Sequence, residues 1–318
     1  MQTSLTELLY ILCGLICFYS AYETLKDKNH PSKIPTALFW GILGFIFAFS
    51  RIGLLWGNED IFIKDIYVGY LILVLALLSA FKLVKFDKFN ESTKEFKEKS
   101  AERIGNKIFV PALTLAIVTF LVAQIWSKQL GSLVALGIAS VAAVIMALVM
   151  TKGTPKEMSD DARRLLEIVG PVNILPQLLA ALGSVFTAAG VGNVIASLIS
   201  NIIPKGNILA GITAYCVGMA LFTMIMGNAF AAFAVITAGI GVPFVMAQGG
   251  NPAIVAALGM TAGFCGTLLT PMAANFNIVP TAILEIKDKK YGVIKYQLPV
   301  ALTMLLIHIV LMYFWAFA

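Results

Sequence analysis

Apolar stretches long enough to cross about 30 Å of hydrocarbon as helices recur along the chain. The first half contains uninterrupted stretches at Leu5–Leu25, Ile34–Trp56, Ile61–Val84, Ile108–Trp126 and Leu130–Met150. The alternating ten-residue segments typical of a transmembrane β-barrel do not occur in the sequence. The pattern predicts an all-α polytopic membrane protein whose residues 1–150 form a five-span scaffold region.

The second half is equally apolar, but Gly, Pro and Asn interrupt it. Its apolar segments are Ile168–Ala189, Val191–Ile203, Asn207–Met226, Asn228–Met246, Asn251–Leu269 and Gln297–Phe317. Gly227 alone separates two of these segments, in "MIMGNAFAAF". Another interruption, Thr270–Asn277, lies in "GTLLTPMAANFNIVP", and apolar residues resume at Ile278. A membrane helix normally runs on unbroken, so both interruptions require a physical explanation.

The composition agrees with a membrane protein, because 59% of the 318 residues are hydrophobic and only 13% are charged. The net charge of +6 comes from a few basic loops, so it does not indicate nucleic-acid binding. The first apolar stretch has no basic residue before it, and no small-residue cleavage site follows, so we expect no cleavable signal peptide. The cysteines lie inside apolar segments, which predicts neither a disulfide framework nor a zinc site.

The basic residues predict a topology. The loops 26–33, 82–107, 151–167 and 285–295 contain 3, 8, 4 and 4 Lys or Arg, which is 19 of the 23 in the chain. Placing these loops in the cytoplasm puts the protein in the cytoplasmic (inner) membrane with both termini outside. Within loop 82–107, opposite charges three or four residues apart in "KEFKEKSAERIGNK" predict a surface helix.

This topology constrains the second half. The segment 207–246 has to enter and leave on the outer side, as a re-entrant hairpin does, with its tip near Gly227–Asn228. The segment 251–286 has to cross once, as a helix broken at Thr270–Asn277. The chain then has about eight spans, a re-entrant hairpin and a broken helix, and residues 151–318 form a transport-type repeat.

Irregular backbone at membrane depth leaves N–H and C=O groups unpaired, at several kcal/mol each. Amide side chains at such breaks can bind either the freed backbone or a ligand, and broken helices aim their dipoles at one point. Small residues at breaks also allow close helix packing, and this alternative remains open. We expect Asn228 and Asn275 to face each other across one substrate or ion site. The predicted site comprises Gly227, Asn228, Ala229, Thr270, Pro271, Asn275 and Asn277.

From Ile174 to Trp315 the order of features resembles the C-terminal repeat of the ion-transporter superfamily, the fold of the divalent-anion:sodium symporters. That repeat has a hairpin with Ser-Asn-Thr at its tip, matched here by Gly227-Asn228-Ala229, followed by a broken helix, matched here by "TPMAANFNIV". Gly227 and Ala229 replace the two hydroxyl residues, which leaves Na⁺ or H⁺ coupling open and implies no other cofactor. The first 150 residues match no inverted first repeat, so the resemblance implies that a separate membrane protein supplies it.

The whole chain is similar to a bacterial family known as domain of unknown function 979, whose members share "MALFTMIMGNAFAAF" and "TPMAANFNIVP" and are labelled permeases without an established activity. Genes of this family often lie beside a second membrane family, domain of unknown function 969, and a pyroglutamyl peptidase. The resemblance therefore implies a hetero-oligomer with that second protein, and pyroglutamate or a related small acid as the substrate.

We expect a permease subunit that moves a small organic anion by alternating access. The alternative is a non-transporting subunit that assembles or stabilises a partner. Catalytic motifs at membrane depth are absent from the sequence, so we expect no enzyme. Ionisable residues near span ends are expected at the membrane interface: Glu7, Arg51, Lys64 and Asp65. His308 lies inside the last span, where it is either hydrogen-bonded packing or a proton carrier.

Overall fold

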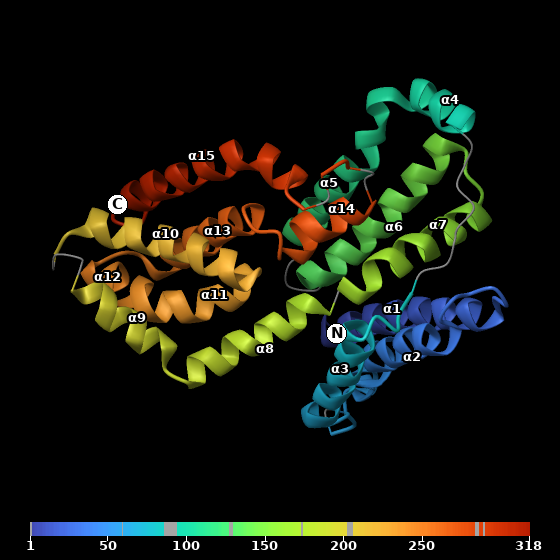
Figure 1. The fold of residues 1–318 in the computed structure, drawn as a ribbon, viewed down its shortest axis with the longest axis horizontal. Helices are drawn as coiled ribbons and strands as arrows, with labels where there is room; N and C mark the ends of the chain where they lie inside the picture. Colours follow the sequence, from blue (N-terminus) through green and yellow to red (C-terminus); the bar gives the residue numbers. More distant parts are fainter. Residues whose placement is uncertain are drawn as a thin grey trace. The chain divides into compact units, whose positions relative to one another are not determined.

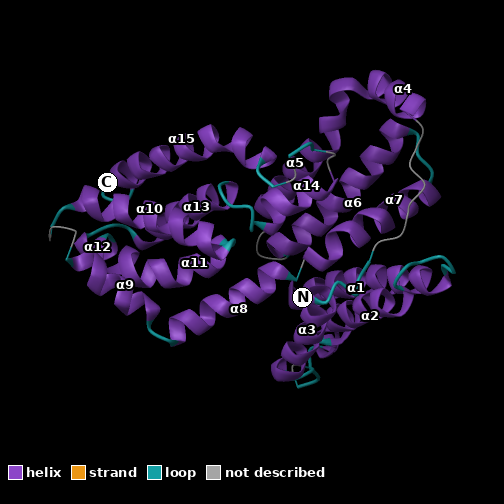
Figure 2. Cartoon of the chain, in the orientation of Figure 1, coloured by secondary structure: helices purple, strands orange, loops and turns teal. Residues whose placement is uncertain are grey.

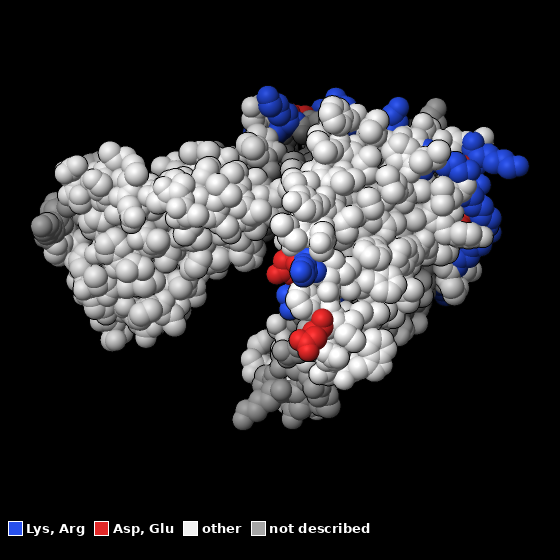
Figure 3. Space-filling view, turned by 90° about the horizontal axis from the view of Figure 1, so that it is seen from below, with Lys and Arg blue, Asp and Glu red and all other residues white. Residues whose placement is uncertain are grey.

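The computed structural model describes residues 2–58, 60–85, 94–126, 130–172, 174–201, 206–283, 286–288 and 290–318. Each regular element in these ranges is helical (Figure 2). Seven of the described helices are long and apolar enough to cross a membrane, and a further pair does so if it is one bent span. The face seen in Figure 3 has broad surfaces without charged side chains, as contact with lipid requires. The helical, multi-pass class is confirmed.

The chain forms two compact units, Met1–Ile168 and Val169–Ala318. The sequence pattern suggested a division after Met150; in the structure the division follows Ile168, so the helix α7 (Pro155–Val169) lies in the first unit except for its last residue. The roles predicted for the two regions, scaffold and transport-type repeat, stay predictions.

The first unit is built on two pairs of adjacent helices, α1 with α2 and α5 with α6. Its elements, coloured blue to green in Figure 1, are α1 (Gln2–Lys26), α2 (Lys33–Phe49), η1 (Ile52–Trp56), α3 (Asp65–Ala80), α4 (Lys94–Ile104), η2 (Gly105–Phe109), α5 (Val110–Ile125), α6 (Gly131–Thr151) and α7 (Pro155–Val169). Helices α1 and α2 pack closely where Gly14 meets Gly44. A Cβ on Gly14 would lie only 2.8 Å from the Gly44 carbonyl oxygen, so the approach requires a glycine there. The predicted surface helix in loop 82–107 is confirmed as α4.

Two predictions for this unit need correction. We expected a span at Ile61–Val84, but α3 has only 16 residues. The Ile63 N–H binds the Ser50 carbonyl, so the chain before α3 is held against the end of α2 rather than in the helix. We also treated 151–167 as a charged loop, whereas α7 is a helix. The Thr154 and Glu157 side chains form a capping box at its start, with Glu157 accepting from the Thr154 N–H at 2.7 Å.

The second unit packs around α10. Its elements are η3 (Gly170–Val172), α8 (Leu175–Ala188), α9 (Val191–Ser200), α10 (Ile208–Met226), α11 (Ala229–Ile236), the π-helical turn η4 (Thr237–Gly241), α12 (Val242–Phe244), η5 (Met246–Gln248), α13 (Pro252–Leu268), the π-helical turn η6 (Ala274–Ile278), α14 (Val279–Ile283) and α15 (Gly292–Trp315). Helices α11, α13 and α15 contact α10, and Tyr215 and Met219 of α10 are fully buried among them. This packing brings the two interrupted segments together.

The interruptions predicted from the sequence are present. Helices α10 and α11 form a hairpin that turns at Gly227–Asn228, and α13 is separated from α14 by the segment that contains η6. By length, Ile208–Met226 and Ala229–Gln248 can each cross a membrane. Two full crossings also return the chain to its starting side, so re-entrance of the hairpin stays a prediction. Helices α8 and α9 make a further bend of 65°.

Candidate functional site

The hairpin turn is made by one glycine and one asparagine. Gly227 ends α10 with φ +72°, and its N–H donates to the Thr223 carbonyl at 2.7 Å. Asn228 then begins α11, and its Oδ1 accepts from the N–H groups of Phe230 at 2.8 Å and Ala231 at 3.4 Å. The turn is therefore tight because glycine tolerates a positive φ and the asparagine caps the next helix.

The interrupted segment after α13 is held by a different amide. The Asn277 Nδ2 group donates to the Thr267 carbonyl at 3.0 Å and to the Thr270 carbonyl at 2.7 Å, where the end of α13 frees carbonyl groups. Both partners can only accept, so this arrangement fixes which end of the carboxamide is nitrogen. Asn277 is only 4% exposed. Its Oδ1 is buried and has no hydrogen-bond partner among the described residues.

The two interruptions lie next to each other. A Cβ placed on Gly227 would be 2.9 Å from the Met272 carbonyl oxygen. A small cavity of about 50 Å³ lies between them, lined by Leu179, Gly227, Asn228, Ala229, Phe230, Phe264, Thr267, Ala273, Ala274 and Phe276. The hairpin turn and the broken helix, separated by about forty residues of chain, thus form one locus inside the second unit.

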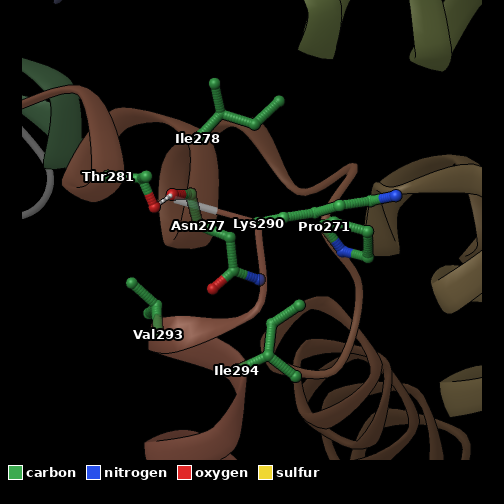
Figure 4. Close-up of a pocket in the computed structure, with 7 residues that line it drawn as sticks. All are labelled: Pro271, Asn277, Ile278, Thr281, Lys290, Val293 and Ile294. Carbon is green, nitrogen blue, oxygen red and sulfur yellow. Dashed lines mark hydrogen bonds between the residues drawn. The ribbon is translucent and has the colours of Figure 1, made fainter. Parts of the chain in front are cut away.

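A larger cavity of about 410 Å³ lies at the far end of the broken segment (Figure 4). It is lined by Pro271, Asn277, Ile278, Thr281, Lys290, Val293 and Ile294. The Thr281 hydroxyl donates to the Asn277 carbonyl at 2.6 Å, which leaves its oxygen able to accept. Figure 4 shows the Asn277 carboxamide oxygen on the side of Val293. Lys290 is the one charged residue among those described in the lining.

The predicted site residues divide between these cavities. Gly227, Asn228 and Ala229 line the small one, whereas Pro271 and Asn277 line the large one. Thr270 is buried; its carbonyl binds Asn277 and its Oγ1 accepts from the Met272 N–H at 3.3 Å.

The side chain of Asn275 is not among those the structure describes, so its facing of Asn228 stays a prediction. Sequence reasoning missed Thr267, Thr281 and Lys290. Lys290 was counted only as a topology signal, although its distance along the chain from "ANFNIVP" places it within reach of the broken segment.

Several ionisable side chains outside the two cavities form ion pairs or hydrogen bonds within the protein. Arg51 and Asp65 pair at 3.5 Å with exposed side chains, as expected of an interface. Glu7, which we expected at the membrane interface, is buried, and its Oε1 has no partner in the described part of the chain. The His308 Nδ1 lies 2.6 Å from the Met304 carbonyl of its own helix, which favours the packing interpretation.

Asp288 is engaged at the start of α15. It accepts from the N–H groups of Tyr291 at 3.0 Å and Lys290 at 3.2 Å, and from the Lys295 ammonium at 2.9 Å. The Tyr291 N–H, followed by the Lys295 ammonium, holds the pKa of Asp288 below its ordinary value. Asp288 therefore stays ionised at neutral pH while bound to its own loop.

Comparison with known proteins gives one match. A family described as "Protein of unknown function (DUF979)" matches residues 7–317, nearly the whole chain. No curated protein matches, and no solved structure matches. The likeness therefore carries no activity with it, and the site has to be interpreted from its own geometry.

Proposed function

The chain belongs to the family of proteins of unknown function (DUF979), and on that premise we propose that it is one subunit of a secondary transporter for a small organic anion. The transport mechanism is alternating access around the adjacent interruptions of the second unit. The substrate class includes pyroglutamate and related small acids. The protein lies in the cytoplasmic membrane with both termini outside.

The observation that carries this proposal is how the two amides are used. Asn228 binds backbone with its oxygen, and no hydrogen bond of its Nδ2 group is found within the described ranges. Asn277 binds backbone with its nitrogen and leaves its oxygen unpaired. Each amide thus stabilises an interruption with one end and leaves the other end for a ligand. If these positions served only helix packing, unpaired amide groups would not be needed there. Small or apolar side chains pack against lipid and neighbouring helices without the cost of burying an unpaired polar group.

A companion protein completes the transporter. In transporters of the resembled fold, a second, inverted repeat provides another hairpin and broken helix. The described part of the first unit has α1 and α2 as a plain pair and α5 and α6 as another. We therefore assign the inverted repeat to a separate membrane protein, of the domain of unknown function 969 family.

One observation favours the alternative of a non-transporting assembly subunit. The cavity between the interruptions, about 50 Å³, is far below the roughly 300 Å³ at which small-molecule sites begin. In a transporter this volume belongs to a closed state; in an assembly subunit it is simply packing.

Uptake of radiolabelled pyroglutamate into proteoliposomes distinguishes these functions. We expect uptake when the chain and its companion are reconstituted together, and none with either alone. Full uptake by the single chain would remove the companion from the proposal. Absence of uptake of any small organic anion by the pair would favour the assembly subunit.

The matched variants are Asn228→Ser and Asn251→Ser. Serine also caps helices, so both substitutions preserve the start of a helix and remove only a carboxamide. Asn251 caps α13 through the same type of bond, to Ala253 and Ile254, but does not line the small cavity. We expect Asn228→Ser to lower uptake about 5- to 150-fold, corresponding to the loss of about 1–3 kcal/mol of ligand binding. Asn251→Ser should transport like the parent; equal activity of both variants would contradict the site.

A further inference from the structure

The cavity beside Asn277 has the size of a small-molecule site. Its volume of about 410 Å³ falls within the range of about 300–1,000 Å³ for ligand pockets. It is formed by the end of the broken segment, α14 and the first turn of α15, all within the second unit. Both apolar and polar groups line it, so the chemistry of its ligand can be derived from the polar ones.

The polar groups of the wall accept hydrogen bonds. The Asn277 Oδ1 is unpaired, and its orientation is fixed because the nitrogen end holds two carbonyls. The Thr281 hydroxyl has committed its proton to the Asn277 carbonyl, so only its lone pairs remain. A buried acceptor without a donor costs about 1–3 kcal/mol, and a ligand N–H or O–H removes that cost.

The charge of the wall is positive. Lys290 lies at the exposed rim, with its ammonium 5.2 Å from the centroid of the Tyr291 ring. The negative charge of the neighbouring Asp288 is compensated by its ion pair with Lys295, at 2.9 Å, which leaves the charge of Lys290 in excess. The rim therefore attracts an anion, with a strength that falls as salt increases.

We propose that this cavity binds the transported substrate from the side of the 285–295 loop, and that the substrate is a small anion that also carries an N–H or O–H donor. The donor binds Asn277 Oδ1, and the anionic group lies toward Lys290. In the topology derived from charge this is the cytoplasmic side. The inference rests on the proposed function, which it deepens by defining the substrate class. Because Oδ1 is shielded in the present conformation, binding includes movement of the side chains that cover it.

A pair of ligands tests the donor requirement better than substitution of Asn277, which would also disturb the broken segment. Pyroglutamate carries a lactam N–H; 5-oxotetrahydrofuran-2-carboxylate is the corresponding lactone, with oxygen in place of that group. Calorimetric titration of the purified chain in lipid nanodiscs, alone and with its companion, measures both affinities. We expect the lactam to bind about tenfold more tightly, or more, since one hydrogen bond to a buried acceptor has this effect.

Lys290→Gln and Lys287→Gln test the anion requirement. Both remove one charge from the same loop, but Lys287 does not line the cavity. We expect Lys290→Gln to weaken binding of both ligands about fivefold at low salt, with a smaller effect at high salt, and Lys287→Gln to have no effect.

Equal binding of lactam and lactone, equal affinities of the two variants, or no binding at millimolar ligand would each overturn the inference. If the chain and its companion together still transport pyroglutamate in those cases, the proposed function stands and only the inference fails. If the lactam binds selectively but is not transported, the proposed function fails and the inferred ligand class remains.

Discussion

The two units contain different clusters of buried polar groups. The first unit contains a buried cluster of ionisable groups: the fully buried Glu167 accepts from Arg163 at 2.9 Å, Arg163 also lies 3.7 Å from Asp27, and His30 lies 3.9 Å from Glu167. Around the two interruptions of the second unit the buried polar groups are amides and hydroxyls, and two of the amides are bonded at one end only. Breaking a buried ion pair costs about 3–5 kcal/mol, whereas leaving one end of a buried amide unpaired costs about 1–3 kcal/mol.

The surroundings of these groups also differ. The contacts of Arg163 with Asp27 and of Glu167 with His30 join α7 to the chain that connects α1 and α2. The amides of the second unit line cavities. The charged cluster of the first unit therefore connects helices, and under the proposed function the unpaired amide ends of the second unit bind the ligand.

Breaking the buried ion pair should have the largest effect. We expect Glu167→Ala to lower the free energy of unfolding by about 3–5 kcal/mol, because Arg163 keeps a largely buried charge. Thermal unfolding in detergent or nanodiscs measures this. Arg164→Ala removes an exposed pair with Asp161 and should cost below about 1 kcal/mol. The double variant Arg163→Leu/Glu167→Leu should recover most of the stability; similar losses in all variants would show that the pair holds nothing.

Removing the amide that bridges the broken segment should have the next effect. Asn277→Ala leaves the Thr267 and Thr270 carbonyls without this donor and should lower stability by about 1–3 kcal/mol. The control is Asn201→Ala, whose Nδ2 binds the Ser197 carbonyl at an exposed helix end. Denaturant unfolding should separate the two variants clearly. If they are equally mild, the interruption does not depend on Asn277.

The contact between the hairpin turn and the broken helix can be tested with two glycines. Gly227→Ala and Gly249→Ala both place alanine at a positive φ, which costs roughly 1–2 kcal/mol. Only at Gly227 does the new methyl meet another group, the Met272 carbonyl, whereas nothing lies within 4 Å at Gly249. We expect Gly227→Ala to be the more destabilising, by about 1 kcal/mol or more. Equal transition midpoints would show that the adjacency is loose.

The smallest effect concerns pH and the start of α7. The Thr154 backbone N–H, followed by the Thr154 hydroxyl, lowers the pKa of Glu157 from its ordinary 4.5. The folded pKa is the lower one, so the capping contribution is complete above about 4.5 and is lost as pH falls through the folded value. Hydrogen exchange at the first turn of α7 should accelerate over this acidic range. Glu157→Gln should remove the acceleration, and an unchanged pH profile would exclude this carboxylate.

The sequence predicted the elements better than their contacts. Apolar length located α1, α2, α5, α6 and α15, because burial in lipid leaves little choice of structure. Gly227 next to Asn228 identified the hairpin turn, since positive φ and helix capping are local properties. The helix α7 was missed because its charged residues were counted only for topology, although Thr154 and Glu157 already form a capping-box spacing.

The roles of the amides could not be assigned from sequence. The π-helical turn η6 rotates residues 274–278 away from an α-helical register, and Asn277 consequently turns toward the end of α13. A spacing argument based on 3.6 residues per turn cannot foresee that rotation. Whether side chains from two separate segments face each other likewise depends on packing across many residues.

The two bonds of Asn277 also make the end of α13 a closed ring of chain. They join this side chain to carbonyls ten and seven positions earlier, so residues 267–277 have few conformations left to exchange. Movement of α14 against α13 must therefore carry the ring as a body or break both bonds together. If this unit alternates between two conformations without breaking these bonds, the hinge lies outside residues 267–277. The rate of interconversion then depends on whether the two hydrogen bonds of the Asn277 carboxamide stay intact.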